Sequence, residues 1–206
     1  MWVGGLAMAL AVALAGLAAN AQNKADWTTI TGGDGSLRYS PLDQINASNF
    51  NTLKIAWEWG AADAPGVELG DINGRSLPIY VDGMLLTTSG PRRTVVSLDP
   101  ATGKTLWTFQ EPETPRHAYS MRSNHGKGVA YGRINGRGVV YVTTPGFFLH
   151  ALDAKTGKTL WMHATNSRIW SSTLVADGKV YCGTEDGELI VLAASREKKV
   201  LGKVEF

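Results

Sequence analysis

The sequence contains one motif twice, as SLDPATGKTLW at residues 97–107 and as ALDAKTGKTLW at residues 151–161. The Gly-Lys-Thr ending also occurs in phosphate-binding P-loops. A P-loop, however, needs another glycine five positions before the glycine of that ending, where its backbone begins to wrap the phosphates. Leu98 and Leu152 stand at those positions. The repeated motif therefore indicates a structural unit and not a nucleotide site.

Short runs with a two-residue alternation surround each copy of the motif, and turn-forming pairs separate these runs. The pairs are Asp82-Gly83, Asn135-Gly136 and Asp177-Gly178. Because Asn-Gly and Asp-Gly accept the positive φ angles of type I′ turns, each pair predicts two strands joined by a tight hairpin. A fourth pair, Asp186-Gly187, predicts a further turn near the C-terminal end of the sequence.

Looser copies extend the repeat in both directions. LKIAWEW at residues 53–59 ends a unit before the first motif. Near the C-terminal end, Leu192 and Leu201 stand where the second motif has Leu152 and Trp161. The units recur roughly every 40 to 54 residues, and each offers about four short strands.

Four-stranded units at this spacing are typical of the blades of a β-propeller. We therefore expect an all-β fold in which residues 26–206 form a partial β-propeller. It has about three to four four-stranded antiparallel blades and is an incomplete ring. In each motif the Thr-Gly pair supplies a tight turn, and the tryptophan covers the seam with the neighbouring blade.

The composition limits the classes of partner. The chain has 20 Lys and Arg against 18 Asp and Glu, a net charge of +2. A balance this even over 206 residues provides no basic stripe, so we expect no nucleic-acid partner. The single cysteine, Cys182, cannot form an internal disulfide. Its place inside KVYCGT predicts a small buried strand residue rather than a reactive thiol.

Residues 1–21 carry no charged side chain and end in Ala19, Asn20 and Ala21. Such a run is typical of a secretory signal peptide with an A-x-A cleavage site. It is also nearly long enough to span a bilayer, so an uncleaved membrane anchor through residues 2–19 is the alternative. Both interpretations predict a periplasmic or secreted protein. The leader contains no cysteine, so we do not expect a lipoprotein.

The pattern AxDxxTGxxxW, formed by Ala151, Asp153, Thr156, Gly157 and Trp161, resembles the tryptophan-docking motif of the quinoprotein dehydrogenases. The stretches RYSPLDQIN and GKGVAY also resemble segments of that family. Its members are eight-bladed propellers that bind pyrroloquinoline quinone (PQQ), usually with Ca²⁺. The resemblance therefore implies PQQ as the cofactor and allows Ca²⁺ in a complete ring.

The resemblance also points to individual cofactor-binding positions. Lys127 stands where the family has an arginine; it keeps the charge but lacks the two-pronged geometry that matches a carboxylate. Ser123 stands where sugar-oxidising members have a histidine, and Arg75 where a glutamate touches the quinone. Alcohol-oxidising members carry two adjacent cysteines where this chain has Met121 and Arg122. The candidate cofactor-binding residues are therefore Lys127, Ser123 and Arg75.

No catalytic residue and no metal ligand are assigned. In the family, the catalytic aspartate lies in later blades, beyond the position of Phe206. The family's calcium loop corresponds here to TEDGEL. Its Glu185 and Asp186 are either ligands or part of a solvated hairpin turn. We favour the turn, because Ca²⁺ needs six or more converging oxygens.

One histidine-containing loop, RHAYSMRSNHGKG at residues 116–128, has two interpretations. Loops positioned by a rigid scaffold often carry binding residues. If the resemblance holds, His117 and His125 face the central channel and contact a ligand there. Otherwise the loop is a solvated insertion between blades.

Two functions follow as hypotheses. The first is an exported PQQ-binding-like propeller, a truncated or partial relative of quinoprotein alcohol and sugar dehydrogenases. Its partners are a small-molecule quinone or further propeller blades, including those of a second copy through self-association. The alternative is a non-catalytic propeller scaffold for protein assembly at the cell envelope.

Overall fold

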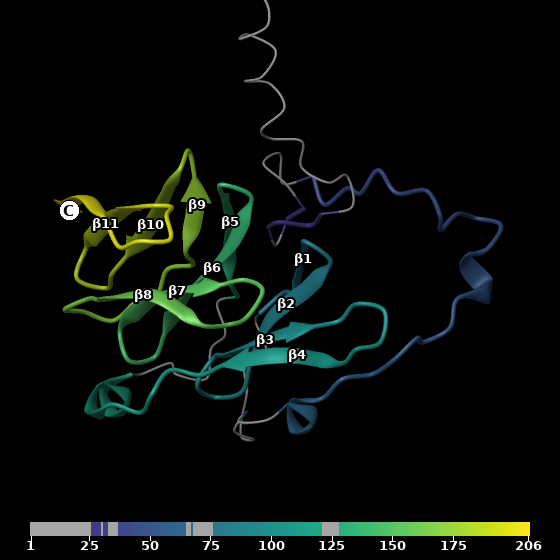
Figure 1. The fold of residues 1–206 in the computed structure, drawn as a ribbon, viewed down its shortest axis with the longest axis horizontal. Helices are drawn as coiled ribbons and strands as arrows, with labels where there is room; N and C mark the ends of the chain where they lie inside the picture. Colours follow the sequence, from purple (N-terminus) through teal and green to yellow (C-terminus); the bar gives the residue numbers. More distant parts are fainter. Residues whose placement is uncertain (1–25, 30, 33–36, 65–66, 68–75, 121–127) are drawn as a thin grey trace, which may run out of the picture.

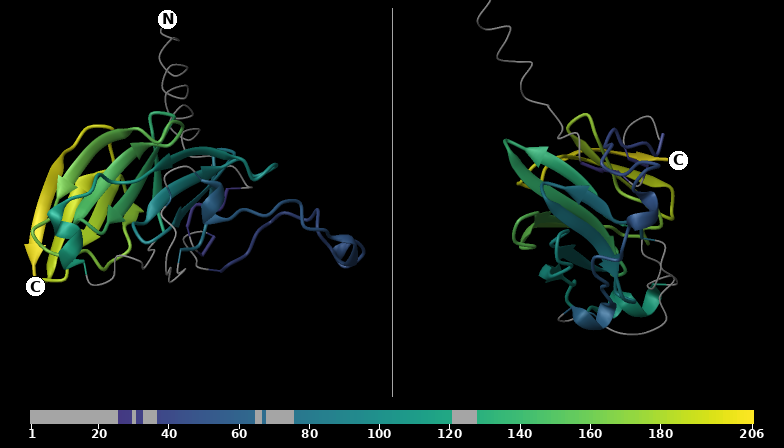
Figure 2. Two further views of the ribbon diagram at one scale, coloured as in Figure 1. Left: turned by 90° about the horizontal axis from the view of Figure 1, so that it is seen from below. Right: turned by 90° about the vertical axis from the view of Figure 1, so that its right-hand side faces the viewer.

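The computed structural model describes residues 26–29, 31–32, 37–64, 67, 76–120 and 128–206. They form three four-stranded antiparallel sheets that stand side by side (Figure 1). In every sheet the strands lie in chain order, so each is a simple meander. Figure 2 shows the same sheets from two further sides. The predicted partial propeller is confirmed, with three blades in the described residues.

The bounds of the elements are as follows. The first sheet contains β1 (Ile79–Val81), β2 (Met84–Ser89), β3 (Thr94–Leu98) and β4 (Thr105–Phe109). The second contains β5 (Ala130–Ile134), β6 (Arg137–Thr144), β7 (Phe148–Asp153) and β8 (Thr159–Ala164). The third contains β9 (Leu174–Ala176), β10 (Lys179–Gly183), β11 (Glu188–Ala193) and β12 (Val200–Glu205). Three short 3₁₀ helices lie outside the sheets, η1 (Phe50–Thr52), η2 (Ala61–Asp63) and η3 (Pro115–Tyr119).

The first hairpin of each sheet has the predicted turn. The φ angles are 50° and 73° at Asp82-Gly83, 50° and 75° at Asn135-Gly136, and 48° and 66° at Asp177-Gly178. Positive φ at both central residues defines a type I′ turn. The Asp-Gly and Asn-Gly pairs therefore specify the β1–β2, β5–β6 and β9–β10 hairpins, as predicted.

The second sheet lies between the other two, so both of its faces are buried. Successive side chains of a strand point to opposite faces and therefore contact different neighbouring sheets. On β6, Val140 and Val142 pack against the first sheet, while Val139 and Tyr141 pack against the third. All four side chains are almost fully buried. Cys182 lies in the core between the second and third sheets, so its predicted place as a buried strand residue is confirmed.

Each motif tryptophan reaches from its own sheet or segment to the next sheet. The indole Nε1 of Trp57 donates a hydrogen bond to the Pro100 carbonyl at 2.9 Å. Trp107 donates likewise to Ala154 at 3.0 Å. Trp161 donates to Ser195 at 2.8 Å. The three indoles therefore make equivalent contacts across three successive seams.

The Asp and Thr-Gly positions of each motif build a turn, and the indole from the preceding unit rests on that turn. The Asp99 carboxylate accepts hydrogen bonds from the N–H groups of Ala101 and Thr102 at 2.8 and 3.0 Å. Gly103 follows at φ 71°, and a Cβ on it would lie 2.6 Å from the ring of Trp57. The motif thus needs an acceptor at the aspartate and a residue without a side chain at the glycine.

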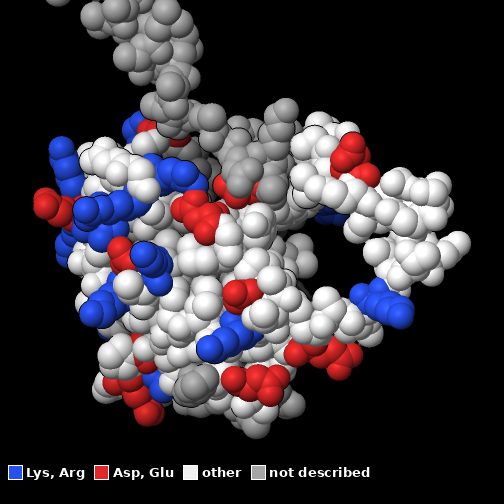
Figure 3. Space-filling view, turned by 45° about the vertical axis from the view of Figure 1, so that its right-hand side comes forward, with Lys and Arg blue, Asp and Glu red and all other residues white. Residues whose placement is uncertain are grey.

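The N-terminal part of the chain lies outside the sheets. Trp27 pairs with Tyr80 as an isolated antiparallel bridge and ties this part to β1. Beyond it the chain runs along one side of the molecule (Figure 1), where Leu37, Tyr39 and Ile55 are exposed. On the face seen in Figure 3, positive and negative side chains are interspersed. None of the helices in the described residues is long and apolar enough to cross a membrane, and the predicted signal at 1–21 lies outside them.

Candidate cofactor pocket

The three cofactor-binding candidates, Lys127, Ser123 and Arg75, all lie outside the described residues. Their described neighbours nevertheless show which parts of the fold meet. Ser76 and Gly128 are the residues that follow Arg75 and Lys127. They lie close together, because a Cβ on Gly128 would be 3.8 Å from the Ser76 Oγ. The structure therefore brings the ends of these two segments to one place.

Ser76 and Gly128 lie at the end of the sheets where β1 and β5 begin, opposite the β1–β2 and β5–β6 hairpins. In a meander, the β2–β3, β4–β5, β6–β7 and β8–β9 connections all fall at the same end. The β4–β5 connection contains the predicted positions Ser123 and Lys127. We refer to this end of the molecule as the loop end.

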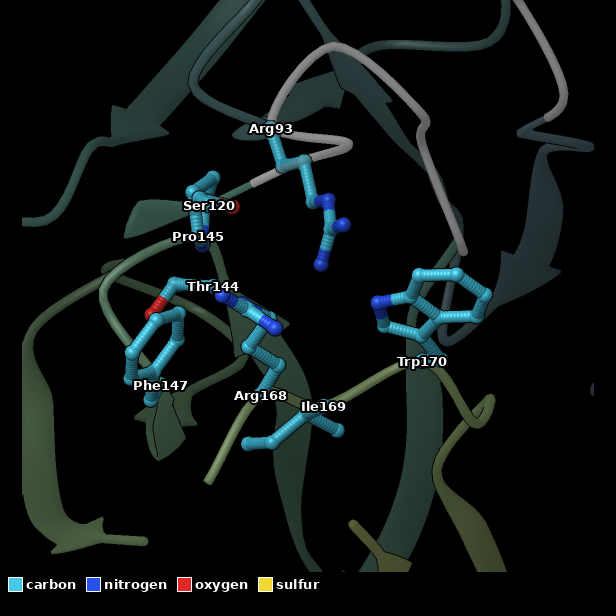
Figure 4. A pocket seen from close by; sticks show the side chains of 8 residues that line it. All are labelled: Arg93, Ser120, Thr144, Pro145, Phe147, Arg168, Ile169 and Trp170. Carbon is cyan, nitrogen blue, oxygen red and sulfur yellow. The ribbon is translucent and has the colours of Figure 1, made fainter. Parts of the chain in front are cut away.

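A pocket lies at the loop end (Figure 4). The β2–β3, β6–β7 and β8–β9 connections supply its walls, and Ser120, which caps η3, closes one side. The eight lining residues are Arg93, Ser120, Thr144, Pro145, Phe147, Arg168, Ile169 and Trp170. In Figure 4 the guanidinium groups of both arginines and the indole N–H edge of Trp170 face the centre of the hollow. The site therefore combines two cations with an aromatic donor.

Arg93 is the most buried of these cations, with only 4% of its surface exposed. It follows the Gly90 turn with φ 55° and donates from Nη1 to the Thr143 carbonyl at 3.4 Å. Burial lowers the pKa of the Arg93 guanidinium to about 10, with the charge of Glu111 acting in the opposite direction. The group stays protonated at neutral pH and places a largely buried positive charge in the pocket wall.

Arg168 is held from two sides. Its Nε donates to the Tyr119 carbonyl at 2.8 Å, and its Nη1 lies 3.2 Å from Glu185 Oε2. The Arg168 carbonyl in turn accepts from the Glu185 N–H at 2.8 Å. Glu185 and Asp186 lie in the turn between β10 and β11, where the Glu185 carboxylate pairs with Arg168. Among the described residues no group of three His, Cys, Asp or Glu side chains is arranged to hold a metal ion.

The hollow enclosed by these eight residues is small. Its cavity volume is about 10 Å³. This volume is close to the minimum for one water molecule. A planar organic cofactor would therefore lie against these walls and not inside them, with its other contacts supplied from outside the eight lining residues.

His117, one of the two histidines of the 116–128 loop, lies beside the pocket wall and not in the pocket. Its side chain is 16% exposed, and its Nε2 is 3.1 Å from Glu111 Oε1. His125 lies outside the described residues. The pocket arginines were missed by the sequence analysis. The order of the predicted hairpins could have found them, because it already places the turns that carry Arg93 and Arg168 at one end.

The comparisons with known proteins agree with this architecture. The family model described as the β-propeller domain of PQQ-type glucose, ethanol and alcohol dehydrogenases matches residues 27–182. This match covers most of the chain. The chain therefore belongs to the PQQ β-propeller family.

Curated relatives name the enzymes it is similar to. The dehydrogenase subunit of a quinone-dependent alcohol dehydrogenase from Gluconobacter oxydans is 31% identical over 182 residues. That match covers 82% of this chain and 22% of the relative. A quinohemoprotein alcohol dehydrogenase from Comamonas testosteroni is 34% identical, with 82% of this chain and 23% of the relative covered. The chain thus spans less than a quarter of the length of these two relatives.

Solved structures give the same result. A quinohemoprotein alcohol dehydrogenase from Pseudomonas putida superposes with a TM-score of 0.65 at 28% identity. That match covers 89% of this chain and 27% of the other. The Comamonas testosteroni enzyme superposes with a TM-score of 0.62 at 29% identity over 91% of this chain and 28% of its own. The three sheets therefore correspond to part of a larger propeller in each of these enzymes.

Proposed function

We propose that this chain is an exported propeller segment of a quinoprotein dehydrogenase and that its loop end contributes one wall of the PQQ site. The observation that carries the proposal is the convergence of Arg93, Arg168 and Trp170 in one pocket. The family membership gives this pocket its context. The periplasmic location and the signal peptide at 1–21 belong to the same proposal.

The donor set fits the chemistry of PQQ. The cofactor is a planar, carboxylate-bearing quinone, so it presents negative charge at its rim and a flat ring system. Guanidinium groups recognise carboxylates through paired N–H donors, and the Arg93 charge lies in a buried, weakly screened setting. Trp170 adds an N–H donor and an aromatic face. These groups match an anionic ring better than a neutral or cationic ligand.

When bound, PQQ would supply the redox chemistry by accepting a hydride from an alcohol or sugar. The residues of this chain would bind and orient it. Arg93 and Arg168 would hold its carboxylates, and Phe147 would limit its position from the side of the β6–β7 turn. Lys127, Ser123 and Arg75 remain proposed contacts from the two segments that meet at Ser76 and Gly128. Any Ca²⁺ would need ligands beyond the described residues.

The three indole contacts have a place in the same proposal. We assign the hydrogen bonds of Trp57, Trp107 and Trp161 to the tryptophan-docking interactions of the family. Their role is to hold adjacent blades at a fixed angle. A fixed angle between blades matters because the β2–β3, β6–β7 and β8–β9 connections, which belong to different blades, together form the pocket walls.

Titration of the full chain with PQQ, followed by calorimetry, tests the proposal. We expect saturable binding that weakens about 10- to 100-fold in Arg93→Met, because a hydrogen bond to a charged group contributes about 1.5–3 kcal/mol. Arg137→Met is the matched control: Arg137 is equally cationic but exposed, and it lies at the opposite end of the sheets. Absence of saturable binding by the unmodified chain would reject the proposal.

The scaffold alternative has an observation in its favour. Large apolar side chains are exposed along the N-terminal segment, including Leu37 at 81% and Ile55 at 77%. Exposed apolar surface of this kind is typical of contacts with other proteins or other blades. Sedimentation of the full chain across a concentration range tests self-association. A concentration-independent monomer that binds PQQ would favour the first function.

A further inference from the structure

Glu111 is a buried carboxylate that the proposed cofactor contacts do not use. It lies just beyond β4, and only 2% of its surface is exposed. Burying a carboxylate without partners carries a large free-energy cost, so such groups persist where they hold something in place. The surroundings of Glu111 show what it holds.

The carboxylate grips the β6–β7 turn directly. The Gly146 N–H donates to Glu111 Oε1 at 2.8 Å. A Cβ on Gly146 would lie 3.0 Å from Oε2 and 3.1 Å from Oε1, so the carboxylate packs against the bare backbone of this glycine. Gly146 stands between Pro145 and Phe147, which both line the pocket. Glu111 therefore fixes the segment that forms one pocket wall.

The other side of the same turn is held as well. Phe147 has φ 66°, and its carbonyl accepts from both the N–H and the Oγ1 of Thr165 at 2.9 Å. Arg116 of η3 donates from Nη1 to the Thr165 carbonyl at 3.0 Å. The β6–β7 turn is thus held by Glu111 on one side and by Thr165 on the other, and Arg116 of η3 bonds to Thr165.

Charged and titratable groups surround the carboxylate from every neighbouring element. His117 of η3 approaches Oε1 at 3.1 Å, and His150 of β7 approaches Oε2 at 3.8 Å. From the β2–β3 connection, Arg92 donates to the Glu111 carbonyl at 2.7 Å, and the charge of Glu111 acts on the nearby Arg93. The carboxylate is therefore enclosed by positive or protonatable groups.

These neighbours keep Glu111 ionised. Burial alone raises the pKa of a carboxyl group. Contacts with His150, Thr144 and the Gly146 N–H, together with the charge of His117, outweigh burial and lower the pKa of Glu111 below its ordinary value. An ionised acceptor makes a stronger bond to a backbone N–H than a neutral one.

We propose that Glu111 is a positioning residue that latches the β6–β7 turn to η3 and so shapes the cationic wall against which the anionic cofactor lies. The inference rests on the proposed PQQ function. The latch also ties the start of the β4–β5 connection, which contains Ser123 and Lys127, to the pocket wall. Glu111 acts through Gly146 and contacts no ligand itself.

The test uses the full chain and two readouts. Glu111→Gln keeps the shape of the side chain and removes its charge. We expect amide hydrogen exchange of the β6–β7 turn to accelerate at least tenfold and the Kd for PQQ to rise at least tenfold. Exchange in β6 and β10 should stay unchanged. Glu188→Gln is the control, since Glu188 pairs with Lys203 in the third sheet, and we expect it to match the unmodified chain in both readouts.

A spectroscopic titration gives an answer that does not depend on the variant folding. In the unmodified chain we expect the Gly146 amide proton to shift with a midpoint below pH 4.5, the ordinary value for a glutamate. A Gly146 signal that does not titrate in acid would overturn the latch. Turn exchange equal to that of the unmodified chain in a folded Glu111→Gln variant would also overturn it.

The two proposals fail separately. If the unmodified chain binds no PQQ, the proposed function fails, while the exchange and Gly146 readouts still decide whether the latch exists. If the chain binds PQQ and Glu111→Gln loosens the turn without changing the Kd, the positioning role is wrong although the proposed function stands.

Discussion

At the scale of single residues, a comparison of two glycines distinguishes the cost of a left-handed backbone from the cost of a steric clash. Gly157 and Gly136 have similar φ angles, 70° and 75°. A Cβ on Gly157 would lie 2.5 Å from the ring of Trp107, whereas a Cβ on Gly136 would meet nothing within 4 Å. The motif glycine is therefore required twice, once by its backbone and once by the indole above it.

This pair gives the first prediction. Gly136→Ala should lower the free energy of unfolding by about 1–2 kcal/mol, the cost of a left-handed residue with a side chain. Gly157→Ala should lower it by roughly 1–3 kcal/mol more, because the methyl group displaces the Trp107 indole. Urea unfolding followed by tryptophan fluorescence measures both. Equal losses in the two variants would show that the indole does not rest on the turn.

Cys182 gives a prediction about reactivity. Its side chain is fully buried, and burial raises the pKa of the Cys182 thiol to about 12. Since the thiolate is the reactive form, a disulfide reagent at pH 8 should label the folded chain at least 100-fold more slowly than the urea-unfolded chain. Rapid labelling of the folded chain would contradict the packing of the second sheet against the third.

At the scale of elements, the seams between sheets carry the stability. Leu152 on β7 is fully buried between the first and second sheets, whereas Leu106 on β4 is 49% exposed. Leu152→Ala should cost about 2–5 kcal/mol in urea unfolding, because it removes buried methyl groups and leaves a cavity. Leu106→Ala should change the free energy of unfolding by less than about 0.5 kcal/mol. Similar losses would mean that the two sheets are not packed as described.

The elements were also what the sequence predicted best, and the reason is local. Asn135-Gly136 fixes a hairpin through its own backbone preferences, so no distant contact is needed to predict it. The glycine and the tryptophan of the motif recur at a fixed spacing, as Gly103 with Trp107 and Gly157 with Trp161, so the repeat is visible in the sequence. Such signals are contained in a few neighbouring residues.

The pocket depends on distant parts of the sequence, so local signals alone do not predict it. Arg93 and Arg168 lie on turns far apart in the sequence and meet only because three sheets stand side by side. Glu111 begins the stretch EPETP, whose charges and prolines are typical of a solvated loop. Its burial depends on the β6–β7 turn of the next sheet. The resemblance pointed to Lys127, Ser123 and Arg75, and these stay predictions.

At the scale of the whole molecule, three blades form one arc with a pocket at the loop end. Matching arcs occur in longer enzymes, since the matches cover only 27% and 28% of the solved relatives. The indoles bridge successive seams, and the connections between strands line the pocket. This division explains how a repeated motif and an unrepeated site coexist in one chain.

The indole N–H signals test the central claim, that the loop end is a wall of the PQQ site, most directly. The full chain, labelled with ¹⁵N, would be titrated with PQQ while the tryptophan Nε1–H resonances are followed. We predict that the Trp170 signal shifts saturably, while the signals of Trp107 and Trp161, which are hydrogen-bonded across the seams, stay in place. A silent Trp170, or a shift shared equally by all the indoles, would contradict the account.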